Sequence, residues 1–332
     1  MMPNCSLPAP SVYSTIMQTS HFLSYPVYLF TLVVLFRERS ILFKKYKPYL
    51  IFHVLLNIAS ETYMAYFMLP VTYLPLPMYR TTGWLSDFGF SGLLQFYILS
   101  ALIGSTVQSI LEMFFYRFKV TVVQSPAKVY LKIVTVQVNT HRILLAASVL
   151  VEALTFEDSL RAQYVKLDRL YRENSLLPPE ITCYSCIIAV HEHWVFWTLS
   201  IIWCVQLFAA VTSAATVVIY VSKYLKTSEV TLSAEMIKWQ RMLLISIFIQ
   251  STLHGTLIGI PIAVQIIATL VELRNDSFAQ TLLILVTYHG FASTCSMIFF
   301  TKPVRDKMIP CMNNSARTQP APQSSARSNT VN

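Results

Sequence analysis

The sequence predicts an all-α membrane protein, a bundle of seven transmembrane helices with an extracellular N-terminus. Its composition, its separate apolar runs and the placement of Lys and Arg between them lead to this fold class. Hydrophobic residues make up 55% of the 332 residues and charged residues only 12%, about half the charged share of a soluble domain. The net charge of +9 is divided among the loops rather than gathered on one face, which argues against a nucleic-acid partner.

Seven apolar runs account for most of the chain. A helix needs about 20 residues to cross the hydrocarbon layer, and only the fourth run is close to the lower limit. We expect His141 and Arg142 to lie at the inner end of that fourth helix and to reach the membrane surface. The predicted spans are approximately 14–36, 50–74, 91–116, 141–157, 195–221, 242–271 and 281–301.

The orientation follows from the loops. Of the 25 Lys and Arg residues, 19 lie in segments 37–49, 117–142, 222–241 and the tail after residue 301. Positive loops stay in the cytoplasm, so residues 1–13 are predicted to be extracellular, without the features of a cleavable signal peptide.

Three further segments follow from this topology. Residues 14–301 form the transmembrane domain, residues 302–312 a short juxtamembrane helix, and residues 313–332 a disordered cytoplasmic tail because they lack large apolar side chains. Asn4 stands in an outward-facing Asn-Cys-Ser triplet and is a predicted glycosylation site. Cys311, just inside the membrane, is a candidate for palmitoylation, with an inert thiol as the alternative.

Cysteines outside the membrane favour a disulfide, because bonds of this kind persist in extracellular segments. The candidates are Cys5, Cys183 and Cys186, and we expect Cys5 to pair with one of the other two. Cys183 and Cys186 belong to the extracellular segment 157–194. The helical spacing of apolar residues in this segment predicts an amphipathic helix over the extracellular mouth.

Ionisable side chains inside membrane spans are costly and therefore candidates for function. At a rise of 1.5 Å per residue, Glu61, His254 and His289 all lie roughly 12–18 Å from one end of their helices, near the middle of the bilayer. One hypothesis is a polar cluster that joins helices two, six and seven; the alternative is that each group is satisfied separately. Pro261, which removes a backbone hydrogen bond from the sixth run, predicts a hinge there.

No catalytic or metal-binding pattern is present in the sequence. The histidines of the spans lie on different helices, and no nucleophile stands in a GxSxG-like motif. We therefore expect neither an enzyme nor a cofactor or metal.

Four segments carry a more specific pattern. Helix two contains Glu61 with two prolines and a glycine at fixed intervals, and helix three ends in the sequence FFYRF. The other matching residues are Ser233, Gln240, Gln250 and Pro261 around helix six, and His289, Gly290, Ser293, Thr294, Met297, Lys302, Pro303 and Arg305 at helix seven.

With these motifs the chain resembles the nematode serpentine chemoreceptors of the Str superfamily, most closely class H, with class I as a near relative. The resemblance implies a G-protein-coupled chemosensory receptor in the plasma membrane of a sensory cilium, with a small-molecule ligand (an odorant or pheromone-like compound) and a heterotrimeric G protein as partners. One departure is Phe115, which stands where the family has an acid next to the arginine, here Arg117. Without that restraint we expect either high basal activity or impaired coupling.

The receptor hypothesis places a ligand between the outer halves of helices three, five, six and seven. Depth alone selects the candidate wall residues, which are Gln95, Tyr97, Trp203 and Gln265. At the inner face Arg117, Lys238 and Arg241 are the predicted contacts with the G protein, although a cationic rim also suits anionic lipid.

Two other classes of membrane protein are alternatives. A transporter predicts repeated halves with broken helices at corresponding positions, whereas the seven runs are unequal and the chain has only seven glycines. An odorant-gated channel with an intracellular N-terminus conflicts with the distribution of Lys and Arg.

Overall fold

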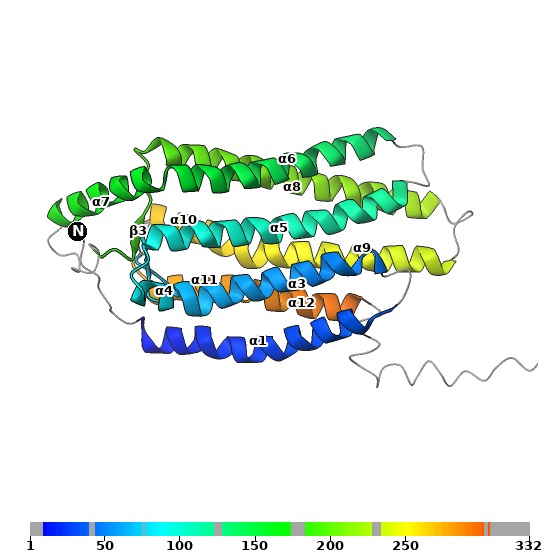
Figure 1. The fold of residues 1–332 in the computed structure, drawn as a ribbon, viewed down its shortest axis with the longest axis horizontal. Coiled ribbons are helices and arrows are strands. Elements are labelled where there is room, and N and C mark those ends of the chain that lie inside the picture. Colours follow the sequence, from blue (N-terminus) through cyan, green and yellow to red (C-terminus); the bar gives the residue numbers. More distant parts are fainter. Residues whose placement is uncertain are drawn as a thin grey trace, which may run out of the picture.

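The computed structural model describes residues 9–39, 44–74, 76, 78–122, 128–173, 183–227, 234–301 and 305. Its long helices lie side by side along one axis (Figure 1). Six helices in the described residues are long and apolar enough to cross a membrane by length and composition. A seventh segment, helix two, lies among them and is formed by α3 and η1.

The seven segments follow the chain in order. Helices one and two are α1 (Ser11–Arg37) and α3 (Lys47–Thr62) continued by the π-helix η1 (Tyr63–Met68). Helices three, four and five are α5 (Gly92–Val122), α6 (Lys128–Leu154) and α8 (Trp194–Thr227). Helix six is α9 (Ala234–His254), the π-helix η4 (Gly255–Gly259) and α10 (Ile260–Leu270); helix seven is α11 (Asp276–Thr287) and α12 (His289–Phe300).

The helices differ from the predicted spans by several residues at many of their ends, and the differences in helices two and four change the interpretation of the sequence. Helix two ends at Met68 rather than near residue 74, because Leu69 takes a left-handed conformation with φ 41° and Pro70 cannot continue a helix. Helix four runs over Lys128–Leu154, not 141–157, so it is not short. Arg142 therefore lies near the middle of this helix instead of at its inner end.

A small antiparallel sheet covers one end of the bundle. Strand β2 (Met78–Thr81) lies between β1 (Pro70–Thr72) and β3 (Cys186–Ile188). Val71 pairs with Arg80, and Arg80 also pairs with Cys186. The short helix α4 (Trp84–Asp87) follows β2, and the hydroxyl of Tyr13 in α1 donates to the carbonyl of Pro70 at 2.6 Å. We call this end of the molecule the sheet end.

The amphipathic helix expected in segment 157–194 is α7 (Phe156–Glu173). Leu167 anchors it against Cys183 and Cys186, and Lys166 forms an ion pair with Glu192 at 2.6 Å, which lowers the pKa of the Glu192 carboxyl through their hydrogen bond. The helix projects from the sheet end beside α6 (Figure 1). In the described part of the chain the sheet covers the end of the bundle, and the sequence did not predict this sheet.

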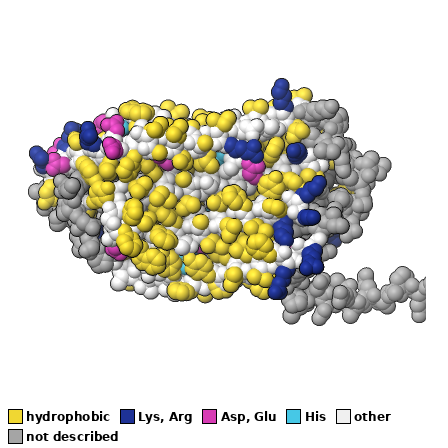
Figure 2. Space-filling view, in the orientation of Figure 1, with side chains coloured by type: hydrophobic (Ala, Val, Ile, Leu, Met, Phe, Trp, Pro, Cys, Tyr) yellow, Lys and Arg dark blue, Asp and Glu magenta, His cyan; other side chains and the backbone are white. Residues whose placement is uncertain are grey.

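Charge is distributed unequally along the molecule. Figure 2 shows a mostly apolar face between two charged ends, one with Lys and Arg together with acidic side chains and the other with Lys and Arg nearly alone. The second we call the basic end; it contains the last turns of α1 and α5 and the first turn of α3. An apolar belt between polar ends is what a membrane-spanning bundle requires.

Two hydrophobic clusters pack the interior. The larger, toward the basic end, joins side chains from all seven helices, among them Leu35, Val54, Phe114 and Met297. The smaller lies toward the sheet end and contains Tyr63, Met64, Met68, Leu99, Ile187, Ile258 and Val286.

Candidate functional site

Between these two apolar clusters the interior is polar. On helix two, Asn57 and Glu61 come after Val54 of the larger cluster and before Tyr63 of the smaller one, while His53 directly precedes Val54. His254 and His289 occupy the corresponding places on helices six and seven. All five side chains are buried, with at most 5% of their surface exposed. We call this group, together with His21 of α1, the polar core.

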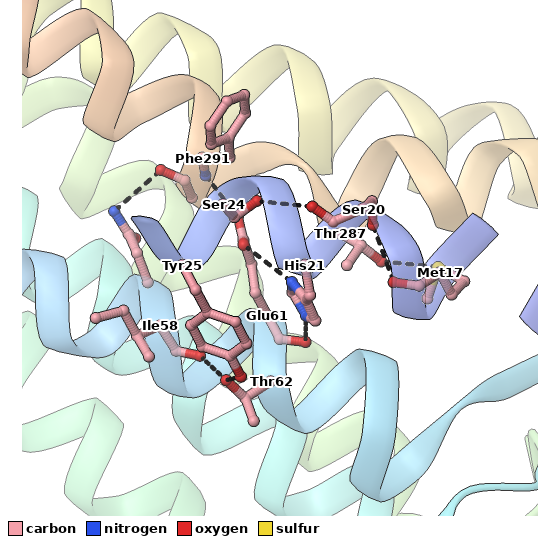
Figure 3. Close-up of polar contacts among 12 residues, drawn as sticks. Met17, Ser20, His21, Ser24, Tyr25, Ile58, Glu61, Thr62, Thr287 and Phe291 are labelled. Carbon is pink, nitrogen blue, oxygen red and sulfur yellow. Dashed lines mark hydrogen bonds and ion pairs between the residues drawn. The ribbon is translucent and has the colours of Figure 1, made fainter. Parts of the chain in front are cut away.

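Glu61 pairs with His21 across helices one and two (Figure 3). Nε2 of His21 lies 2.6 Å from the backbone carbonyl oxygen of Glu61, and Nδ1 lies 3.5 Å from Oε2 of the Glu61 carboxyl. Because a carbonyl oxygen can only accept, Nε2 carries a hydrogen. The approach of Nδ1 to Oε2 is then favourable only when a single proton lies between them, on the imidazole or on the carboxyl group.

The other carboxyl oxygen of Glu61 reaches helix seven. The backbone N–H of Phe291 donates to Oε1 at 2.5 Å. Helix α12 begins at His289, so Phe291 lies in its first turn, where N–H groups lack a partner within the helix. A carboxylate at a helix N-terminus is also stabilised by the helix dipole. Glu61 therefore connects helices one, two and seven.

Three histidines form the second part of the polar core. The rings of His53 and His254 have centroids 5.3 Å apart, and those of His254 and His289 are 5.1 Å apart. His53 binds Ser109 of helix three through Nδ1 at 2.7 Å and Ser293 of helix seven through Nε2 at 3.1 Å. This chain of rings connects helices two, three, six and seven.

The tautomers of two of these histidines follow from their partners. Nδ1 of His254 lies 2.9 Å from the carbonyl oxygen of Gln250, and Nδ1 of His289 lies 2.6 Å from that of Val286. Both Nδ1 atoms are therefore donors, and both Nε2 atoms are acceptors. Neither Nε2 atom has a hydrogen-bond partner among the described residues. Buried acceptors of this kind normally bind a donor such as an internal water molecule.

Helix irregularities coincide with the polar core. The π-helix η1 begins two residues after Glu61, η4 begins directly after His254, and helix seven is interrupted at Tyr288, directly before His289. π-turns weaken the regular hydrogen-bond pattern and are frequent at functional sites. Three helices thus change geometry next to their buried ionisable residues.

The predicted cluster of Glu61, His254 and His289 has a different arrangement in the structure. His254 and His289 are in contact, while the carboxyl group of Glu61 faces His21. Asn57 lies between the two parts, with Nδ2 3.3 Å from Nε2 of His53 and 3.5 Å from the carbonyl oxygen of Gly290. His21 and His53 were not among the predicted site residues, although both are histidines within predicted spans.

Within the described residues no group of three His, Cys, Asp or Glu side chains is arranged to hold a metal ion. The ring contacts of the three histidines are edge-on or tilted. Proton and hydrogen-bond chemistry is therefore what the polar core offers.

The four candidate ligand residues have different surroundings in the structure. Gln95 is buried and donates through Nε2 to Ser86 at 3.1 Å and to the carbonyl of Phe90 at 3.0 Å. Tyr97 packs edge-on against Phe156, with ring centroids 6.4 Å apart. Trp203 lies beside Gly104 where helices three and five approach, and Gln265 is half-buried on α10.

The space expected for a ligand contains part of the sheet. Ile187 of β3 belongs to the smaller hydrophobic cluster, where it packs with residues of helices two, three, six and seven. Ile187 lies 88 residues after Leu99 of helix three in the sequence, a separation that no local pattern bridges.

Cysteines of the sheet end differ in their bonding. Cys183 is disulfide-bonded, and its partner lies outside the described residues, as does Cys5. Cys186 is buried in β3. Between the two pairings left open by the sequence, this favours the pair Cys5–Cys183.

We expect Cys5→Ser and Cys183→Ser to cause the same loss of stability, about 2–5 kcal/mol, because both remove one cross-link between the N-terminal segment and the sheet. Cys186→Ser is the matched control and is expected to retain the cross-link. Peptide mapping under non-reducing conditions checks the pairing. A linked peptide that contains Cys186 instead of Cys183 contradicts it.

At the basic end, Arg117 and the two other predicted coupling residues are placed differently. Arg117 is buried on α5, with its guanidinium 3.9 Å from the ring centroid of Tyr46 and 5.8 Å from that of Tyr116. Glu112, the nearest acid on α5, binds Arg142 instead. Lys238 and Arg241 are exposed on α9. Phe115 replaces the acid that the family has near this arginine. In its absence, the rings of Tyr46 and Tyr116 are the neighbours of the Arg117 guanidinium.

Pro261 lies in the first turn of α10, immediately after η4. Gly255 and Gly259 bound η4, and a Cβ atom added to either would meet no atom within 4 Å. The irregular segment of helix six is thus longer than a single proline kink. Asn4, Cys5 and Cys311 lie outside the described residues, as do segments 306–332 and 302–304.

A bundle of seven membrane helices with a buried polar core defines the class of the seven-transmembrane receptors. The family model of the serpentine type 7TM GPCR chemoreceptor Srh matches residues 8–314. The chain therefore belongs to this family, and the resemblance inferred from its motifs is confirmed. A comparison with curated proteins finds no match.

Proposed function

We propose that this receptor detects a small odorant or pheromone-like molecule and signals to a heterotrimeric G protein. The observation that carries the proposal is the coincidence of the polar core with irregular segments in helices two, six and seven. A buried network with more than one proton arrangement, placed where three helices deviate from regular geometry, is suited to two bundle conformations of similar free energy. Family membership supplies the chemosensory role.

In this proposal the sheet end is extracellular and the basic end faces the cytoplasm of a sensory cell, in the plasma membrane of its cilium. The concentration of Lys and Arg at the basic end supports this orientation. Glycosidase sensitivity of Asn4 tests it directly. A receptor glycosylated at Asn4 loses mass on digestion, whereas an intracellular N-terminus leaves the mass unchanged.

Ligand binding would act through helix six. His254 is the last residue before η4, so a shift of the ring against His289 is transmitted to the segment that contains Pro261 and, at the other end of α9, to Lys238 and Arg241. The four wall residues predicted from depth have different surroundings, so we place the ligand instead beside Ile187, above the polar core. Displacement of Ile187 by a ligand would alter the packing of helices two, three, six and seven together.

The decisive experiment is a panel of odorants applied to cells that express the chain, with a calcium or cAMP readout. We expect a dose-dependent response that Arg117→Ala abolishes at equal surface expression, because Arg117 occupies the G-protein end of helix three. Lys119→Ala, which removes an exposed cation from the same helix, is the matched control and should leave the response unchanged. A response of wild-type size in the Arg117 variant would contradict the proposed coupling role.

A further inference from the structure

An ion pair lies in the middle of a membrane helix and faces outward. Arg142 is roughly 21 Å from Lys128 and roughly 18 Å from Leu154, the two ends of α6, at 1.5 Å per residue. Its side chain is 46% exposed, and that of its partner Glu112 is 18% exposed. Charged groups that face hydrocarbon are costly and rare, so this position calls for a polar neighbour.

The guanidinium is held in one orientation. Nε of Arg142 donates to Oε1 of Glu112 and Nη2 donates to Oε2, both at 2.7 Å, while Nη1 donates to Asn139 at 2.9 Å. Gln108 donates to the same carboxylate and accepts from His141. Arginine has five N–H groups, and three of them have these partners. Two Nη hydrogens remain for an acceptor outside the pair.

A groove begins at this ion pair and continues along α6. It is a shallow depression of about 560 Å³ that is broadly open to the surroundings. From Arg142 to Ala153 it follows one face of the helix for roughly 16 Å. The small side chains of Ala146 and Ala153 leave the space of the groove. The groove is polar at Arg142 and apolar along the rest of its length. Its lining residues are Gln108, Arg142, Leu145, Ala146, Val149, Leu150 and Ala153.

We propose that this groove binds a neutral membrane lipid with a single hydroxyl group, of the sterol or long-chain alcohol class. The hydroxyl oxygen accepts from the Nη hydrogens of Arg142, and the apolar body lies along Leu145–Ala153. Lipid acyl chains contain no hydrogen-bond acceptor. If they filled the groove, the remaining N–H groups of Arg142 would lie unpaired in hydrocarbon, at a cost of several kcal/mol each.

Charge complementarity selects a neutral occupant. Glu112 already balances Arg142, so an anionic head group at the remaining Nη hydrogens would be repelled by the adjacent carboxylate. A second copy of the chain on this face would form a two-fold interface in which identical surfaces meet. Near the two-fold axis the two Arg142 guanidinium groups would approach each other, and their like charges disfavour that arrangement.

Photoaffinity labelling of the full-length receptor in cell membranes tests the site, with a diazirine-bearing sterol as the probe. We expect the label on peptides from residues 143–154 and competition by excess unlabelled sterol or long-chain alcohol. Ala146→Phe, which fills the groove, should reduce labelling per receptor by about tenfold, the effect of roughly 1.4 kcal/mol. Leu154→Phe, at an exposed position outside the groove, is the matched control and should label as wild type does.

Three results would overturn the proposal. Equal labelling of the Ala146→Phe and wild-type receptors shows that the groove is not the site. Stronger competition by an anionic single-chain lipid than by a neutral alcohol contradicts the charge argument. Cross-linking of two receptors through α6, lost in Ala146→Phe while sterol labelling persists, assigns the groove to a second copy. Surface expression measured in parallel separates each of these from a failure to fold.

Discussion

Glu61→Ala is expected to remove most of the receptor from the cell surface, whereas Glu61→Gln is expected to fold and to change basal signalling. The alanine variant leaves the N–H of Phe291 and Nδ1 of the His21 imidazole buried without their partner. Each such orphan costs about 1–3 kcal/mol, and the emptied volume adds a further penalty. Together these approach the total stability of an ordinary domain, about 5–15 kcal/mol.

The glutamine variant separates folding from switching. Its amide oxygen can accept from Phe291, and its amide N–H can donate to Nδ1 of His21, so it imitates the state in which the shared proton is on the carboxyl group. If the other proton position contributes to the active or the inactive conformation, basal signalling must change.

Surface staining and basal cAMP, measured in the same cells, check both predictions. Glu192→Gln is the matched control, because Glu192 forms only an exposed ion pair with Lys166, worth about 0–1 kcal/mol. A Glu61→Gln receptor with unchanged basal signalling and unchanged ligand response would contradict the proposal that the polar core is a switch.

Gly290→Ala is expected to destabilise the receptor by about 1–3 kcal/mol, the usual cost of extra volume in a packed interior. A Cβ atom at this position would lie 2.8 Å from the hydroxyl of Tyr28, 2.9 Å from Cβ of Asn57 and 2.9 Å from Oε1 of Glu61. Helix seven must move away from helices one and two, which stretches the bond from Phe291 to Glu61.

Gly259→Ala is the matched control on helix six, where an added Cβ meets no atom within 4 Å. There the reduced freedom of the unfolded chain should leave stability unchanged or raise it by less than about 1 kcal/mol. Thermal unfolding of the two purified variants gives the comparison. Equal melting temperatures would mean that helix seven does not pack as closely on helices one and two as the structure places it.

The fold class was predictable because membrane insertion depends on local composition. About 20 apolar residues span a bilayer whatever their neighbours are, so seven runs indicated seven helices. Bounds were less predictable where the local signal was weak. Helix four extends to Lys128 although its first half contains several polar side chains, and helix two ends early because Leu69 and Pro70 turn the chain into a strand.

The candidate site was only partly predictable. Depth estimates placed Glu61, His254 and His289 at one level, and His254 does contact His289. Depth along a helix axis says nothing about rotation around it, however, and rotation decides which side chains face each other. This is why His21, on a helix without other ionisable residues in its interior, was missed as the partner of Glu61.

By itself the sequence determined the number of spans, the asymmetry of Lys and Arg, and the family, through motifs such as His289-Gly290 and Lys302-Pro303. These properties depend on local composition and spacing. Only the tertiary structure decided that Glu61 connects helices one and seven, that Ile187 enters the bundle, and that Arg142 faces outward from the middle of α6. Each of these depends on contacts between segments distant in the chain, whose geometry is set by packing of the whole bundle.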